Sequence, residues 1–127
     1  MAAGLTLDAG ALIAAEKGER VIWRYFKEAV GRGARVTVPA PALAQAWRGN
    51  SPQVARLLAG CEVEVLDEVR AKRTGELLAK ARRSDVVDAM VVLGAVARGD
   101  AILTSDPDDI HGLIAAAGAP SARVIVL

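Results

Sequence analysis

Aspartates gather in one stretch of the sequence, residues 84–109. Asp85 and Asp88 are three residues apart, so on a helix both side chains lie on the same side of its first turn. Asp88 precedes a strongly apolar run, where a carboxylate is costly unless it has a partner or faces a cleft. The short apolar segment Ala101–Thr104 then predicts a buried strand that ends close to Asp106. This stretch therefore predicts acids from one helix and one strand end.

Two further acids extend this group. Asp8 follows the predicted strand Leu5–Leu7, and Asp109 lies three residues after Asp106. Several like charges in one cleft either raise their own pKa values or bind a cation. Because these segments contain no His or Cys ligand pair, Mg²⁺ or Mn²⁺ is favoured over Zn²⁺. A cation of this kind, held by Asp8, Asp88 and Asp106, can activate water for attack on a phosphodiester, which indicates nuclease chemistry.

Each acid also has a purely structural interpretation. Asp8 can cap the helix that follows it, and Asp85 can complement the dipole of its helix after a Ser84 N-cap. Asp108 is typical of a proline-containing turn. His111 lies in a predicted surface helix, so we expect no direct role for it. Asp88 is the acid that these local explanations account for least well.

The predicted elements place two of the acids on one edge of a sheet. Short apolar strands alternate with segments of helical periodicity. The predicted strands are 5–7, 35–38, 62–66, 101–104 and 123–126, and the predicted helices are 11–16, 21–30, 42–48, 52–58, 68–82, 85–98 and 109–117. This order predicts an α/β fold with a mainly parallel sheet covered by helices on both faces. Asp8 and Asp106 should then share the carboxyl edge, provided that their strands are neighbours.

Composition limits what such a site can belong to. The 127 residues, 53% of them hydrophobic, can bury one core, so we expect a single domain over residues 1–127. A net charge of +1 and 3% aromatic residues exclude a globally basic nucleic-acid binder, and any RNA contact must be local. The single Cys61 excludes an internal disulfide and fits a reducing cytoplasm. We find no secretory signal and no membrane-spanning run, and expect a cytoplasmic protein.

Four motifs, in the right order, give the chain a family resemblance over almost its whole length. They are LDAGALIA with Asp8, VPAPALAQAWRG with Gln45, DAMVVLGAVARG with Asp88, and LTSDPDDI with Asp106. The sequence resembles the PIN domain, in particular the small VapC-type toxins of prokaryotic toxin–antitoxin pairs. That family spaces its last two acids as Asp88 and Asp106 are spaced here.

The resemblance implies a three-layer α/β/α sandwich that binds Mg²⁺ or Mn²⁺ and hydrolyses RNA. It implies metal ligands at Asp8, Asp88 and Asp106, with Asp85 and Asp109 as supporting acids. Thr104 and Ser105 would orient Asp106 through hydrogen bonds. Proteins that look like this usually form homodimers and are held inactive by a small antitoxin, so we expect both kinds of partner and no membrane.

Gln45 departs from the family pattern, because a Glu usually stands at this position. A glutamine oxygen can still contact a cation, but it cannot act as a base, and the site loses one charge. This departure motivates a second hypothesis, a PIN-like binding module that has lost catalysis. A third hypothesis is a different Mg²⁺ enzyme such as a phosphatase, but the sequence lacks the second acid that many phosphatases have two residues after the first. Gln45 also has a structural interpretation as an exposed helix residue.

Basic residues lie directly before the acids in sequence. Arg82 and Arg83 are predicted to contact RNA phosphates next to the cleft. The basic residues earlier in the same predicted helix more simply solvate its exposed face. Trp23 and Trp47 are predicted to be core residues, although their helices could also supply a surface for an antitoxin.

Overall fold

The computed structural model describes residues 3–127 and contains one parallel sheet of five strands. The strands are β1 (Leu5–Leu7), β2 (Val36–Pro39), β3 (Glu62–Glu64), β4 (Ala101–Thr104) and β5 (Val124–Val126). They are arranged in the order β3-β2-β1-β4-β5, so the first strand of the chain lies in the middle. In the pairing of β1 with β4, Leu7 lies opposite Leu103. The two strands therefore end within one residue of each other, directly before Asp8 and Ser105.

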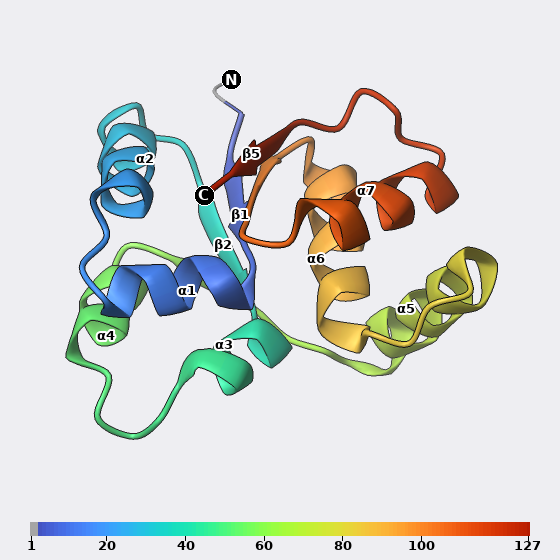
Figure 1. Ribbon diagram of the computed structural model, residues 1–127, viewed down its shortest axis with the longest axis horizontal. Helices are drawn as coiled ribbons and strands as arrows, with labels where there is room; N and C mark the ends of the chain where they lie inside the picture. Colours follow the sequence, from blue (N-terminus) through green and yellow to red (C-terminus); the bar gives the residue numbers. More distant parts are fainter. Residues whose placement is uncertain (1–2) are drawn as a thin grey trace.

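Helices cover both faces of the sheet, as Figure 1 shows. They are α1 (Ala9–Glu16), α2 (Arg20–Gly31), α3 (Ala40–Ala46), α4 (Pro52–Leu58), α5 (Glu68–Ala81), α6 (Val86–Arg98) and α7 (Pro107–Ala116). Helices α1 to α4 share one apolar core with β1 and β2, which includes Leu7, Leu12 and Val38. Helices α5 to α7 form a second core with β4, which includes Val92 and Ile102. The predicted three-layer α/β/α sandwich is confirmed.

The order and type of every predicted element are confirmed, while several boundaries move. The helix predicted over 42–48 ends at Ala46, because Trp47 has an extended backbone with φ −75° and ψ 130°. Trp47 is 39% exposed, so its predicted place in the core is wrong, whereas Trp23 is only 9% exposed. The final predicted helix begins at Pro107, two residues before its predicted start. The outer strand ends at Glu64 and is shorter than predicted.

Aspartate side chains begin three of the helices. Asp8, Asp67 and Asp85 accept hydrogen bonds from the backbone N–H groups of Ala11, Arg70 and Asp88, at 2.7, 2.9 and 3.0 Å. Such contacts satisfy an N–H group that has no partner within the helix. Asp85 is itself the N-cap of α6, so the predicted N-cap at Ser84 is wrong. Its carboxylate fixes the first turn of the helix that carries Asp88.

Two acids outside the predicted site belong to a buried ion-pair network. Asp100 accepts hydrogen bonds from Thr6 Oγ1 at 2.8 Å and from Arg98 Nε at 2.9 Å. Arg98 also pairs with Glu64 of β3. The network joins β1, β3 and α6, and its acids are paired with a cation, as buried charges require. Among residues 3–127, no helix is long and apolar enough to cross a bilayer.

Candidate metal centre

The candidate site lies between β1 and β4, where the order in which the chain adds strands to the sheet reverses. β1 and β4 are adjacent, but the chain leaves β1 into α1 on one face and leaves β4 into α7 on the other. Such a switch point leaves a crevice beyond the carboxyl ends of the two strands. Asp8 and Asp106 both follow these strand ends, and the backbone N–H of Asp8 donates to the carbonyl of Leu103 at 3.2 Å. The strands are therefore neighbours, as the sequence prediction required.

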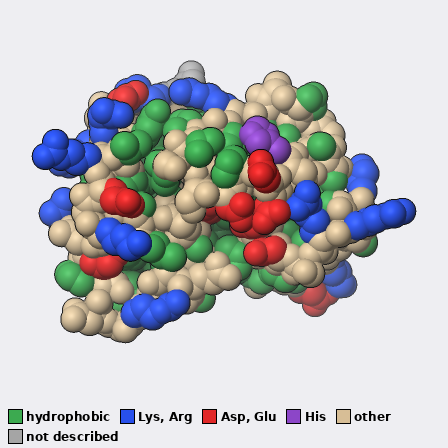
Figure 2. All heavy atoms as spheres, in the orientation of Figure 1, with side chains coloured by type: hydrophobic (Ala, Val, Ile, Leu, Met, Phe, Trp, Pro, Cys, Tyr) green, Lys and Arg blue, Asp and Glu red, His purple; other side chains and the backbone are tan. Residues whose placement is uncertain are grey.

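Three carboxylates form the centre of the site. One oxygen of each of Asp88, Asp106 and Asp109 lies within 4.8 Å of the others. Asp88 comes from the first turn of α6 and is 9% exposed, whereas Asp106 precedes α7 and Asp109 lies in its first turn. Figure 2 shows acidic side chains gathered in the middle of this face. Asp109, which the sequence placed in a supporting role, thus belongs to the closest group.

Asp8 borders this trio. It is buried, at 3% exposure, and accepts from the N–H of Ala11 in α1. Its negative charge helps to raise the pKa values of both Asp88 and Asp106. Asp8 is therefore close enough to interact electrostatically with both carboxyl groups. The sequence prediction grouped Asp8, Asp88 and Asp106. The structure brings Asp88, Asp106 and Asp109 closest together, with Asp8 beside them.

The pKa values of these carboxyl groups respond to burial and crowding. Burial is the first cause that raises the pKa of Asp88 to about 7, followed by the charges of Asp85, Asp106 and Asp8. The pKa of Asp106 is raised first by a hydrogen bond with Asp109, which requires a shared proton. Burial also raises the pKa of Asp8, and hydrogen bonds from Thr104 and Ala11 partly offset this effect. The cluster therefore favours an added proton or a bound cation.

Thr104 connects two of the acids. The backbone N–H of Asp106 donates to Thr104 Oγ1 at 2.8 Å, and the Thr104 hydroxyl donates to the Asp8 carboxylate. Ser105 lies in the same turn and packs against Gly10 of α1. A Cβ atom added to Gly10 would lie only 1.9 Å from Ser105 Oγ. Gly10 thus permits close approach between α1 and the turn that carries Asp106.

Replacing Thr104 by Val should lower the free energy of unfolding by about 1 kcal/mol, because it removes the acceptor of the partly buried N–H of Asp106. The variant should also weaken Mn²⁺ binding, since neither Asp8 nor Asp106 keeps its orientation. Urea denaturation and calorimetry measure the two effects. Thr104→Ser keeps the hydroxyl and should restore most of the Mn²⁺ affinity. A Val variant that binds Mn²⁺ like the unmodified chain would contradict this role.

Arg83 supplies the positive charge next to the cluster. Its guanidinium pairs with Asp109 at 2.8 Å and fits against Gly112, where a Cβ would come within 2.1 Å. Within residues 3–127, no other cation pairs with any of the five candidate acids. Arg82 is exposed and adopts a left-handed conformation (φ 56°) at the end of α5. Their predicted contacts with RNA remain a prediction.

Gln45 lies on α3, which packs against α6, and its side chain is exposed. In the part of the chain that the structure describes, no side-chain hydrogen bond joins Gln45 to an acid. Its predicted place in the site therefore stays a prediction. A hollow of about 850 Å³ lies elsewhere, between β3, α5 and α6, and none of the candidate acids lines it.

Comparisons with known proteins place the fold. No protein-family model matches the sequence, and no curated protein matches it significantly. Among solved structures, a chain of DNA-bound VapBC from Salmonella typhimurium is 19% identical, with a TM-score of 0.67 over 98% of both chains. A second structure contains VapBC2 from Rickettsia felis bound to a DNA fragment from the VapBC2 promoter. One of its chains is 12% identical, with a TM-score of 0.66 over 97% of this chain and 98% of that one. This chain has a PIN-like fold.

A third structure, PAE2754 from Pyrobaculum aerophilum, supports the PIN-like fold over 98% of this chain and 92% of that one. It is 17% identical, with a TM-score of 0.62. At these identities the likeness concerns the fold, so the site must be argued from its own residues.

The donor set of the PIN-like chain fits a divalent cation. Asp88, Asp106 and Asp109 offer hard oxygen ligands, and Asp8 adds a further carboxylate beside them. Mg²⁺ and Mn²⁺ prefer such ligands, and one Arg cannot neutralise four acids. Asp109 was predicted only as a supporting acid, and its ion pair with Arg83 was not predicted from the sequence. The three-residue spacing of Asp106 and Asp109 was a local signal for the role of Asp109. No local signal in the sequence predicted that Arg83 would pair with it.

Proposed function

We propose that this chain is a metal-dependent endoribonuclease that hydrolyses RNA phosphodiester bonds with Mg²⁺ or Mn²⁺. The observation that carries the proposal is the group of three carboxylates within 4.8 Å at the switch point of the sheet. Asp88, Asp106 and Asp109, together with Asp8, would hold the cation. When bound, a divalent cation supplies Lewis-acid stabilisation of the leaving oxygen and an activated water.

The chain's own residues would prepare this site. Asp85 fixes the first turn of α6 and so positions Asp88. Thr104 holds Asp8 and the Asp106 backbone in one hydrogen-bonded unit. Asp88 must lose its proton before it can bind a cation. Arg83 holds Asp109, and the exposed Arg82 next to it is the better placed of the two to contact an RNA phosphate.

We further propose that this nuclease is the toxin of a toxin–antitoxin pair, acting in the cytoplasm as a homodimer and inhibited by a small antitoxin. The VapBC complexes among the structural neighbours support this proposal. Exposed apolar side chains outside the acid cluster offer surface for such partners, for example Trp47, Val65 and Val69, which are 39%, 59% and 58% exposed.

Cleavage of RNA by the purified chain tests the proposed activity. Labelled single-stranded RNA should be cut internally when Mg²⁺ or Mn²⁺ is present and should stay intact when a chelator removes the metal. Adding Mn²⁺ back should restore cleavage. If RNA stays intact at saturating metal, while the chain still binds RNA or a partner, the alternative of a catalytically inactive PIN-like module is correct.

Gln45 motivates that alternative, and its effect is measurable. If the side chain faces the cation, Gln45→Glu should tighten Mn²⁺ binding about tenfold by calorimetry, because it adds a carboxylate ligand. Gln53→Glu adds the same charge on α4, outside the acid cluster, and should change Mn²⁺ affinity much less. Equal effects of the two substitutions would remove Gln45 from the site.

A further inference from the structure

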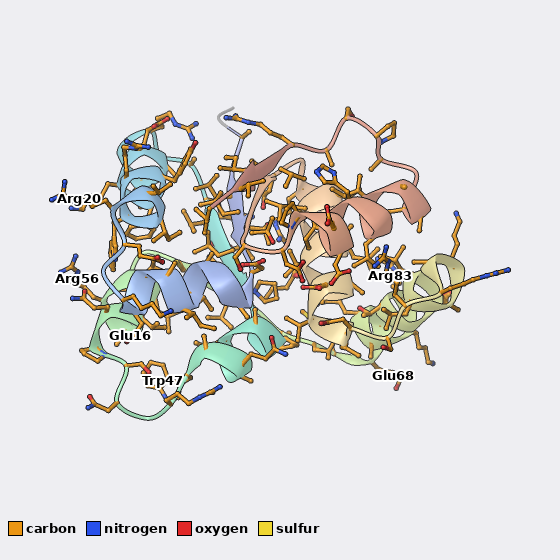
Figure 3. The ribbon with its side chains drawn as sticks, in the orientation of Figure 1. Glu16, Arg20, Trp47, Arg56, Glu68 and Arg83 are labelled. Carbon is orange, nitrogen blue, oxygen red and sulfur yellow. The ribbon has the colours of Figure 1, made fainter. Side chains whose placement is uncertain are left out.

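A second charged feature lies at the opposite end of α1 from the acids. A hollow of about 710 Å³ is lined by Gly18, Arg20, Trp23, Arg24, Lys27, Glu28, Gln53 and Arg56. Figure 3 shows Arg20 and Arg56 projecting from the same end of the molecule. The net charge of the chain is only +1, so four cations around one hollow are a local concentration.

The cations of the hollow are not neutralised by neighbouring acids. Within residues 3–127, none of Arg20, Arg24, Lys27 and Arg56 has a carboxylate partner within 4.0 Å. Glu28 is the one acid among the described lining residues, and it pairs with Arg32 at 3.7 Å. The nearby Glu16 is also engaged, because it accepts hydrogen bonds from the N–H groups of Gln53 and Val54 at the start of α4. A positive field therefore remains at the hollow.

The arrangement of these cations is regular. Arg20, Arg24 and Lys27 have the spacing i, i+4 and i+7, which places them in one row along α2. Arg56 reaches across from α4, and its guanidinium lies 4.4 Å from the centre of the Trp23 ring. Trp23 is itself fixed, because its Nε1 donates to the carbonyl of Ala15 at 3.0 Å. Stacking on Trp23 orders Arg56 and leaves its N–H groups for an anionic ligand.

The ligand chemistry that fits is a chain of phosphates. A row of cations matches a polymer that repeats its negative charge, and guanidinium groups bind phosphate oxygens well. Trp23 is 9% exposed and covered by Arg56, so the hollow offers no open ring for stacking a base. Contacts of this kind position a nucleic acid without reading its sequence. The eight residues of α1 span about 12 Å between the hollow and Asp8.

We propose that the hollow formed by α2 and α4 anchors the phosphate backbone of the RNA substrate, away from the bond that is cut. This inference rests on the proposed ribonuclease function and adds to it a second region of RNA contact, separate from Arg82 and Arg83. The anchor holds a strand that continues past the acid cluster along α1. It raises affinity for long RNA and is not needed for the hydrolytic step.

Binding of a labelled 20-nucleotide RNA, measured by fluorescence anisotropy with chelator present, tests the anchor. The triple variant Arg20→Gln, Arg24→Gln, Lys27→Gln should bind at least about tenfold more weakly at low salt. The slope of log affinity against log salt should fall by about 2, at roughly 0.7 per lost phosphate contact. A control, Lys72→Gln, Arg73→Gln, Lys80→Gln on the exposed side of α5, removes the same charge and should have less than half the effect. Circular dichroism and the melting temperature verify that both variants fold.

Cleavage assays separate this inference from the proposed function. With Mn²⁺, the α2 variant should cut the 20-nucleotide RNA with a raised KM and an unchanged kcat. If the unmodified chain cuts RNA and the two triple variants bind and cut it alike, the anchor is disproved and the nuclease stands. If the α2 variant keeps its RNA affinity and salt slope but loses binding to an acidic polypeptide, the hollow belongs to a protein partner and the inference is wrong. If the unmodified chain neither binds nor cuts RNA, both proposals fail.

Discussion

Asp88→Asn is expected to lower metal-dependent RNA cleavage at least about 100-fold, since even residues that only support metal ligands contribute tenfold to 100-fold. Asp88 has the most buried carboxylate of the central trio and lies within 4.8 Å of Asp106 and Asp109. Asparagine keeps the size of the side chain but removes the charge that a cation requires. Calorimetry with Mn²⁺ and a single-turnover cleavage assay should show the loss of metal affinity and of rate together.

The same helix that carries Asp109 provides a matched control for this substitution. Asp108 is exposed in the first turn of α7 and does not belong to the trio. Asp108→Asn removes one negative charge close to the site and should leave the cleavage rate within about a factor of three, because exposed charges interact weakly through solvent. If Asp88→Asn and Asp108→Asn reduce cleavage equally, Asp88 is not a specific metal ligand.

Mn²⁺ binding is expected to weaken about fivefold between pH 7 and pH 6, and about 50-fold between pH 7 and pH 5. The cause is the raised pKa of Asp88, about 7 in the metal-free chain, because the proton on Asp88 must leave before the cation binds. Above this pKa the affinity should level off. Calorimetric titrations at several pH values measure the profile, and the number of protons released on binding should fall as the pH rises through 7.

The metal-free chain should show the linked effect on stability. The folded pKa of Asp88 is raised above its ordinary value of 3.8, so this residue contributes stability that is fully present below pH 3.8 and is lost as the pH rises towards 7. Asp88→Asn should therefore stabilise the metal-free chain at pH 8 by about 1–2 kcal/mol, after allowance for solvent screening. It should also flatten the stability profile between pH 4 and pH 7.

Two outcomes would contradict the pH prediction. One is Mn²⁺ affinity that does not change between pH 5 and pH 7 in the unmodified chain. The other is an Asp88→Asn variant whose free energy of unfolding has the same pH dependence as that of the unmodified chain, measured by urea denaturation with chelator present. Either result would mean that Asp88 is ionised throughout this range.

The sequence by itself determined the element order and the acids at the strand ends. Apolar runs bounded by Gly, Pro and Asp are local signals, and they located β1 and β4 to within a residue. Helical connections between successive strands are typical of parallel pairing. In a parallel sheet the residues that follow the strands, such as Asp8 and Asp106, lie at the same edge. Asp88 could be predicted as a site residue because a carboxylate within an apolar helix is costly unless it has a partner or faces a cleft.

Only the tertiary structure decided which side chains meet in that region. The pairing of β1 with β4 joins distant parts of the chain, and the orientation of α7 brings Asp109 towards Asp88. Arg83 meets Asp109, and Arg56 stacks on Trp23, for the same reason. Such contacts depend on how helices pack on the sheet, and no periodicity along the chain encodes them. The sequence therefore determined the acids of the candidate centre, whereas packing decided their closest grouping, their counter-charge and the cationic hollow at the far end of α1.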